Sequence, residues 1–361
     1  MLLDRVGIVL VTSPARSHPS TDMVWGALGS TSLLGGLASS QITVVCDGYR
    51  TPTDLEPEHA ERVTQKLSKN AFALSKRGIV TTNTAEAYQA YQHQLQREVD
   101  ERGLAHRISV KAMRTHQGFA LCVRSGLLDM QRRGLDYALV IQHDRGFIRC
   151  VPREDMELLV RQFDVDTTTR YIGFASSTSK LLATRLGPKY RLGHLLERRS
   201  RQLREGLYLR PSIFWFDSNH LVHVSRCLNC LYEPFTHAPP NLRAHCAATR
   251  PAGIGTFTLR RGDFIEDRFG TEQKAVLTSL CAAPEQLLLE AFDFFGSYLV
   301  EEVVDADACD AEEDESSDGS GDDLPANVCT LLDAHGRVSH VAHMDARGAR
   351  PRAWLSQLPT L

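Results

Sequence analysis

The sequence lacks the glycine-rich signatures of several nucleotide-binding folds. No G-x-G-x-x-G motif follows the first apolar run, Val6–Thr12, which argues against a Rossmann dehydrogenase or methyltransferase. The next loop, Ser13–Ser17, contains no glycine, whereas a sugar-phosphate nucleotidyltransferase normally carries a glycine-rich, basic phosphate loop at this place. The missing glycines therefore disfavour a nucleotidyltransferase, which stays open as an alternative function.

Long apolar runs and a disulfide pattern are also missing. The N-terminal run Leu2–Val11 is too short to span a bilayer and is interrupted by Asp4 and Arg5. We therefore expect no membrane span and no signal peptide. The nine cysteines form an odd number without framework spacing, which favours reduced thiols and a cytoplasmic location.

Basic residues are absent from one segment, 301–323, which holds twelve of the 44 acidic residues. With few apolar residues, this segment is predicted to be a disordered acidic insert. The rest of the chain is net basic, which suits a phosphate-bearing ligand. No nucleic-acid-binding motif is present, and we expect no nucleic-acid partner.

Apolar periodicity predicts alternating strands and helices. The expected strands and helices are, in order, Val6–Thr12, Thr21–Ala38, Ile42–Cys46, Glu56–Arg77, Thr84–Arg102, Ile108–Met113, a helix from Gly118, Ala138–Gln142, Tyr171–Phe174, Ser212–Phe216, Asn219–Leu231, Thr271–Leu280 and Pro284–Phe295. This order predicts an α/β fold with a mainly parallel sheet flanked by helices, followed by a half of α+β character. We expect a catalytic domain over residues 1–300, divided at about 150, and a C-terminal extension over 324–361 that packs on it.

The most informative stretch is Leu135–Cys150. It contains a buried strand that ends in the polar residues Gln142-His143-Asp144. The earlier predicted strand, Ile42–Cys46, is likewise followed by a polar residue, Asp47. Ligands of open α/β sheets bind at the carboxyl ends of the strands, so Asp47 and Asp144 are candidate site residues. The competing interpretation of Asp144 is a helix cap or an ion pair with Arg145 or Arg149, and that of Asp47 is a plain turn.

With these pieces placed, the chain resembles a nucleotide-sugar-dependent glycosyltransferase of the GT-A fold, nearest to the inverting family-two type. The matching elements, in chain order, are Val11-Thr12-Ser13-Pro14, Val44-Val45-Cys46-Asp47-Gly48, His116-Gln117-Gly118 with Arg124, Gln142-His143-Asp144 in place of the D-x-D motif, and Phe264-Ile265-Glu266-Asp267. Gln142 replaces the first acid of D-x-D.

The resemblance implies a nucleotide-diphosphate sugar donor, with a UDP-sugar as the default, and a carbohydrate or other hydroxyl acceptor. Asp144 and His143 would hold Mn²⁺ or Mg²⁺. The implied nucleotide-binding residues are Thr12, Ser13, Asp47, Gly118 and Arg124. Asp267 is the preferred general base and Glu266 the second choice.

The segment Phe214–His220 combines an aromatic side chain with polar groups. Trp215, Asp217 and His220 are therefore predicted to bind the acceptor, although a tryptophan such as Trp215 is more often a core residue than a carbohydrate platform. A non-catalytic, glycosyltransferase-like binding protein also remains open, because the first acid of the metal motif is missing.

Overall fold

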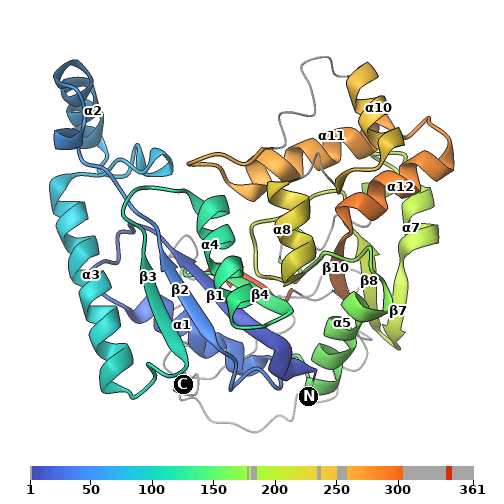
Figure 1. Ribbon diagram of the computed structural model, residues 1–361, viewed down its shortest axis with the longest axis horizontal. Helices are drawn as coiled ribbons and strands as arrows, with labels where there is room; N and C mark the ends of the chain where they lie inside the picture. Colours follow the sequence, from blue (N-terminus) through green and yellow to red (C-terminus); the bar gives the residue numbers. More distant parts are fainter. Residues whose placement is uncertain are drawn as a thin grey trace, which may run out of the picture.

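The centre of the protein is a twisted sheet with helices packed against it (Figure 1). The computed structural model describes residues 2–176, 179, 185–233, 237–249, 258–303 and 339–343. Within these residues the sheet has nine strands in the order β3-β2-β1-β4-β9-β6-β10-β8-β7. A second, two-stranded sheet pairs β11 with β5.

The elements have the following bounds. The strands are β1 Val6–Thr12, β2 Ile42–Cys46, β3 Ile108–Ala112, β4 Tyr137–Gln142, β5 Arg145–Phe147, β6 Tyr171–Gly173, β7 Arg201–Arg204, β8 Leu207–Pro211, β9 His220–His223, β10 Ser297–Glu302 and β11 Val341–His343. The helices are α1 Asp22–Ser30, α2 Pro57–Lys69, α3 Thr82–Glu101, α4 Phe119–Arg132, α5 Arg153–Val165, α7 Gly193–Arg199, α8 Val224–Tyr232, α10 Pro240–Thr249, α11 Thr271–Ser279 and α12 Glu285–Phe295.

Four adjacent parallel strands, β3, β2, β1 and β4, form the first half of the sheet. Every residue of β1 and β2 is buried, as expected for β-branched runs covered on both faces. Val11 pairs with Gln142, and Thr12 pairs with Cys46. The residues that follow β1, β2 and β4 therefore lie together at the carboxyl ends of these parallel strands, which we call the edge of the sheet.

The second half of the sheet is mixed. Strand β9 runs antiparallel to both of its neighbours, β4 and β6, and β8 runs antiparallel to β10 and β7. The other seven strands share one direction. The predicted α/β class with a mainly parallel sheet is thus confirmed.

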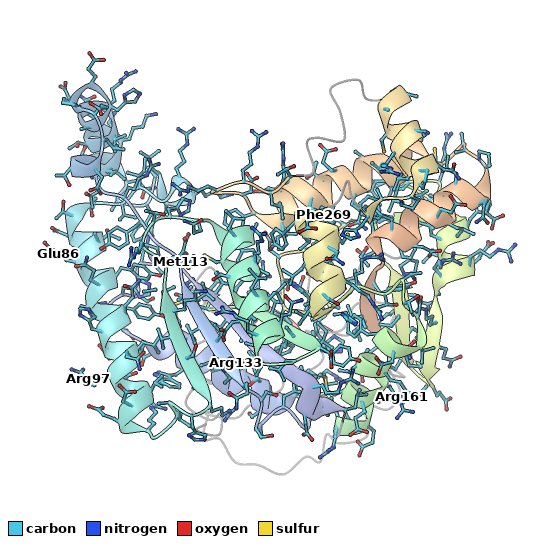
Figure 2. All side chains as sticks on the ribbon, viewed as in Figure 1. Glu86, Arg97, Met113, Arg133, Arg161 and Phe269 are labelled. Carbon is cyan, nitrogen blue, oxygen red and sulfur yellow. The ribbon has the colours of Figure 1, made fainter. Side chains whose placement is uncertain are left out.

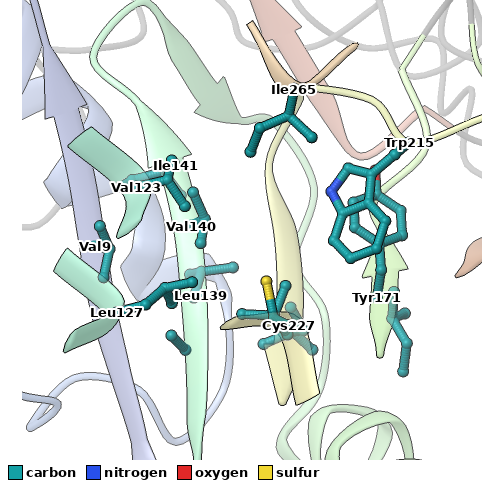
Figure 3. Close-up of a cluster of buried hydrophobic side chains, with 14 of the residues drawn as sticks. Val9, Val123, Leu127, Leu139, Val140, Ile141, Tyr171, Trp215, Cys227 and Ile265 are labelled. Carbon is teal, nitrogen blue, oxygen red and sulfur yellow. The ribbon is translucent and has the colours of Figure 1, made fainter. Parts of the chain in front are cut away.

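Helix α4 packs closely on the parallel strands. Its residues Val123 and Leu127 lie against Val9 and Leu139 in the buried cluster of Figure 3. The close approach depends on Gly126, because a Cβ there would lie 2.3 Å from a methyl carbon of Val9. A larger residue at this position would push the helix away from β1.

The predicted strand Ser212–Phe216 is a loop between β8 and β9, so this prediction was wrong. The Ser212 hydroxyl donates to the Phe214 carbonyl over 2.5 Å and accepts from the Phe214 N–H over 3.2 Å. Such local side-chain hydrogen bonds compete with a strand ladder. The predicted helix Asn219–Leu231 is likewise corrected, because its first residues form β9 and the helix begins at Val224.

The predicted helix Glu56–Arg77 is also too long, since α2 ends at Lys69. Asn70 is extended, and its side-chain oxygen accepts the Phe72 N–H over 3.0 Å. An asparagine that bonds to the backbone two residues on favours a turn, which ends the helix.

The expected boundary between the catalytic domain and the acidic insert falls inside β10. Glu301 and Glu302 belong to this strand, and Arg210 and Arg149 pair with them at 2.8 and 2.9 Å. Residues 304–338, which include most of the predicted insert, lie outside the described residues. The predicted C-terminal extension is described only at 339–343, where β11 pairs with β5.

Glu302 joins three separate segments and makes the stability depend on pH. Burial alone would raise its pKa, but hydrogen bonds from His340 and Arg149 outweigh burial and lower the pKa from 4.5 to about 2. A lowered carboxyl pKa gives stability that is complete above the unfolded value and is lost as the pH falls through the folded value.

We expect Glu302→Gln to lower the free energy of unfolding by about 3 kcal/mol at neutral pH. The difference from the wild type should shrink as the pH falls from 4.5 toward 2. Urea unfolding of both proteins across this range measures it. A difference that stays constant with pH would contradict the assigned ion pairs.

No helix in the described part of the chain is long and apolar enough to cross a membrane.

Candidate functional site

Polar residues converge where β1, β2 and β4 end. Ser13 follows β1, Asp47 follows β2, and His143 and Asp144 follow β4. The Asp47 N–H donates to the Thr12 carbonyl over 2.8 Å, and the His143 N–H donates to the Val11 carbonyl over 3.1 Å. Asp47 therefore follows the strand on one side of β1, and Asp144 follows the strand on the other side. We call Ser13, Asp47, His143 and Asp144 the sheet-edge site.

Asp47 holds the loop that precedes α4. Its Oδ1 accepts the N–H groups of Gly48 and Gln117 over 2.8 and 2.7 Å. Its Oδ2 accepts the Gly118 N–H over 3.1 Å and lies 2.8 Å from Nδ1 of His116. Only 3% of Asp47 is exposed. These contacts occupy both oxygens, so the geometry supports a positioning role and not the predicted direct contact with a nucleotide base.

Gly118 sits where two distant loops touch. Its φ is +81°, and a Cβ there would lie 2.6 Å from the Cα of Gly262. The Gly262 N–H donates to the Gln117 carbonyl over 2.7 Å. Gly118 therefore gives the loop its shape and admits the loop around Gly262, which covers this end of α4.

Two further residues that were predicted to bind the nucleotide, Thr12 and Arg124, differ in exposure. Thr12 is fully buried, and its hydroxyl accepts from the Tyr91 hydroxyl over 3.3 Å. The Thr12 side chain thus belongs to the core, and its contact with a nucleotide stays a prediction. Arg124 is exposed on α4, with its guanidinium 5.4 Å from the ring centroid of Tyr232 on α8.

The turn after β4 carries His143, Asp144 and Arg145, all half-buried. The Arg145 Nε donates to the Gln142 side chain over 3.1 Å, and its carbonyl accepts from the Asn219 side chain over 3.2 Å. The Asn219 contact joins the turn to the loop between β8 and β9. The second half of the chain thus contributes to the same region.

A carboxylate pair lies beside this turn. The Asp217 N–H donates to Glu266 Oε2 over 3.3 Å, and the Glu266 N–H donates to Asp217 Oδ1 over 3.1 Å. Burial raises the pKa of Asp217 well above its ordinary value, and the Glu266 carboxylate raises it further, while Arg145 opposes the shift. Two carboxyl groups in one desolvated place hold a proton more readily than separate ones.

Asp267 points elsewhere. Its side chain is 68% exposed, and Oδ2 lies 3.9 Å from Nζ of Lys76, which comes from the first half of the chain. Glu266 is half-buried and Asp267 is exposed, although both begin the π-helical turn Glu266–Gly270.

Trp215 and His220 are core residues, and their contact with an acceptor stays a prediction. Both are at most 1% exposed. The Trp215 ring packs against Tyr171, with centroids 4.7 Å apart, as the labelled rings in Figure 3 show. Burial lowers the pKa of His220 to about 4. A sugar platform needs an exposed ring face, which neither side chain offers.

One further residue of this region gave no signal in the sequence. His18 lies close enough to His143 for the two imidazoles to interact, and its ring centroid is 4.0 Å from that of Tyr91. Burial lowers the pKa of His18 to about 4, and its Nε2 donates to the Ser13 carbonyl over 3.1 Å. His18 is a loop residue without periodicity, so only the tertiary structure places it here.

Among known proteins, the chain resembles solved structures only, and no match comes from its sequence. No protein-family model matches the chain, and no curated protein matches it. A putative glucose-1-phosphate thymidylyltransferase from Bacillus anthracis is 11% identical, with a TM-score of 0.23, and the match covers 48% of this chain and 57% of that one. A UDP-glucose pyrophosphorylase is 11% identical over 80% and 98% of the two chains, with a TM-score of 0.31.

A mouse xyloside xylosyltransferase 1 is 10% identical over 80% of this chain and 93% of that chain, with a TM-score of 0.31. Identities and TM-scores of this size carry no conclusion about activity. The function proposed below therefore rests on the chain's own geometry.

Proposed function

We propose that this protein is an inverting, divalent-metal-dependent glycosyltransferase that moves a sugar from a nucleotide-diphosphate sugar, by default a UDP-sugar, to an acceptor hydroxyl. One observation carries the proposal. The turn with Asp144 and Arg145 lies at the end of a parallel strand, beside the carboxyl groups of the buried Asp217 and the half-buried Glu266 from the other half of the chain. The reaction needs both kinds of group, one for the leaving diphosphate and one for the acceptor proton.

On the donor side, the leaving nucleoside diphosphate gains negative charge as its bond to the sugar breaks. Arg145 carries a positive charge at this end of the sheet, and Ser13 follows the neighbouring strand β1. A fixed cation placed where charge develops stabilises the transition state more than the ground state. Asp47 contributes indirectly by holding the loop of Gln117 and Gly118.

Asp144 and His143 are the residues that would hold Mn²⁺ or Mg²⁺. In the described parts of the chain, no three His, Cys, Asp or Glu side chains gather to hold a metal ion by themselves. One or two protein ligands with substrate phosphates are a usual arrangement for such ions, so these residues fit a cation together with a diphosphate. A cation there would act as a Lewis acid on the leaving group.

On the acceptor side, we assign the general base to Glu266 and not to Asp267, the first choice from the sequence. The raised pKa of the buried Asp217 favours its protonated form, and we assign the role of proton acceptor to the more accessible Glu266. As the acceptor oxygen bonds to the anomeric carbon and the bond to the diphosphate breaks, the hydroxyl proton passes to Glu266. Asp267 is exposed and faces Lys76, outside this arrangement.

We expect Glu266→Gln to lower kcat by about 100-fold or more while the donor affinity changes little, because a general base acts in the transition state. Asp267→Asn, a matched change at the next residue, should keep kcat within a few-fold of the wild type. Steady-state kinetics of the two variants separates the candidates. If Asp267→Asn lowered kcat strongly and Glu266→Gln did not, Asp267 would be the base.

The function itself is tested by a thermal-shift screen of UDP, GDP, CDP, ADP and UDP-sugars, each with and without Mn²⁺. A ligand selective for the folded state raises the melting temperature. A manganese-dependent shift with one nucleoside diphosphate, followed by release of that diphosphate from its sugar, supports the transferase. Release of pyrophosphate from a nucleoside triphosphate and a sugar phosphate would instead identify a nucleotidyltransferase. No shift with any compound would favour the non-catalytic alternative.

A further inference from the structure

A groove of about 600 Å³ lies between α2 and the segments 50–56 and 74–79. None of the residues of the sheet-edge site lines it. Helix α2 stands at the upper left of Figure 1, and Figure 2 shows its side chains extending from the ribbon there. Volumes of about 300 to 1,000 Å³ are typical of small-molecule sites. We call this cavity the α2 groove.

The charge of the α2 groove is mainly positive. It is lined by Arg50, Arg62, Lys66 and Arg77, with His59, against two acidic residues, Asp54 and Glu56. Three of the cations come from separate segments, so their convergence is a property of the fold.

Most of this positive charge is not neutralised within the protein. In the described part of the chain, Arg62, Lys66 and Arg77 make no side-chain ion pair or hydrogen bond, whereas Arg50 interacts electrostatically with Asp54. The Asp54 carboxylate also accepts the N–H and hydroxyl of Thr51 over 2.6 and 2.8 Å, which commits it to its own turn. Unpaired cations around a concave surface attract a phosphate or similar anion.

The same groove has an apolar part. Leu55, Val63 and Leu74 are half-buried in its wall, and Ile79 is 7% exposed. A ligand that fits the whole cavity therefore carries an apolar group beside its anionic group. A bare anion would leave these side chains uncovered.

The groove is connected rigidly to the loop of the sheet-edge site. The Arg50 N–H donates to the Gly78 carbonyl over 2.7 Å, and the Val80 N–H donates to the Arg50 carbonyl over 3.0 Å. Gly78 in turn packs on the ring of His116, the partner of Asp47. This backbone pairing fixes the positions from which Arg50 and Arg77 extend.

We propose that the α2 groove binds a small molecule that carries a phosphate on an apolar group, at a site separate from the sheet-edge site. Two sources share this chemistry, namely a nucleotide, whose base would contact the aliphatic wall, and an alkyl phosphate of the lipid type. The cations bind the phosphate in either case, and the apolar wall covers the remainder.

Isothermal titration calorimetry of the full chain tests the proposal with UMP, hexyl phosphate and inorganic phosphate. We expect at least one of the two esters to bind more tightly than inorganic phosphate. The double variant Arg62→Gln/Lys66→Gln should weaken that binding by about tenfold or more, since two charge-assisted contacts are lost. Selective binding of UMP or of hexyl phosphate identifies the source.

The matched control is Lys69→Gln/Arg97→Gln, which removes the same charge from α2 and α3 at positions that do not line the groove. It should bind as the wild type does, and so should Asp144→Asn, which separates this site from the proposed transferase site. Binding of neither ester, equal binding of esters and inorganic phosphate, or equal weakening by both double variants would overturn the proposal. Urea unfolding shows whether each variant is folded.

Discussion

Replacement of Asp47 by alanine is expected to lower the free energy of unfolding by about 3 to 5 kcal/mol, because it removes a buried charge from the groups that surround it. The carboxylate accepts three backbone N–H groups, from Gly48, Gln117 and Gly118, and contacts His116. An alanine leaves these donors buried without an acceptor, and each unsatisfied donor costs about 1 to 3 kcal/mol. Urea unfolding measures the loss.

Asp136 provides the control for this prediction. It lies just before β4, pairs with Arg5 at 2.7 Å, and has a side chain that is 45% exposed. Asp136→Ala should cost about 1 kcal/mol or less, as exposed ion pairs do. If Asp47→Ala does not fold at all, Asp47→Asn gives a measurable variant, since its amide still accepts through one oxygen. A loss below about 1 kcal/mol in both Asp47 variants would contradict the positioning role.

Replacement of Asp144 by asparagine is expected to lower kcat/KM by about 1,000-fold and to remove the effect of Mn²⁺ on donor binding. Asparagine keeps the size of the side chain but loses the charge that a divalent cation needs. Asp144 lies in the half-buried turn between β4 and β5, and urea unfolding shows whether the variant is folded. Calorimetric titration of UDP with and without Mn²⁺ gives the binding, and initial rates give kcat/KM.

Asp136→Asn is the matched variant for this experiment as well, because it changes a carboxylate at the opposite end of the same strand. Its binding and rate should equal those of the wild type. An Asp144→Asn protein that still binds UDP with the same dependence on Mn²⁺ would exclude Asp144 as a metal ligand. Loss of rate in both variants would point to a general effect on folding.

For Asp47 and Asp144, the sequence pattern predicted the position in the fold better than the function of the side chain. Both follow buried strands, and the structure puts both at the same edge of the sheet, as predicted. Their environments differ, since Asp47 is 3% exposed and bonded to backbone, whereas Asp144 is half-buried in a turn. We therefore expect substitution of Asp47 to change stability and substitution of Asp144 to change binding.

The acceptor side was predicted less well. Asp217, Trp215 and His220 were all predicted to bind the acceptor, and the structure buries all three side chains. A sequence window shows an aromatic residue beside polar ones and says nothing of which face is covered. Burial of Trp215 depends on Tyr171 and Phe269, which lie far away in the chain.

The sequence by itself determined the parallel half of the sheet, because runs of β-branched residues such as Ile42–Cys46 and the amphipathic helix from Phe119 specify their structure locally. It also determined that polar residues end these strands. Only the tertiary structure decided which carboxylates meet, since Asp217 and Glu266 are 49 residues apart. The α2 groove likewise exists only after folding, because Arg50, Arg62 and Arg77 come from separate segments. Contacts between distant segments depend on how the elements pack, and no local pattern records that packing.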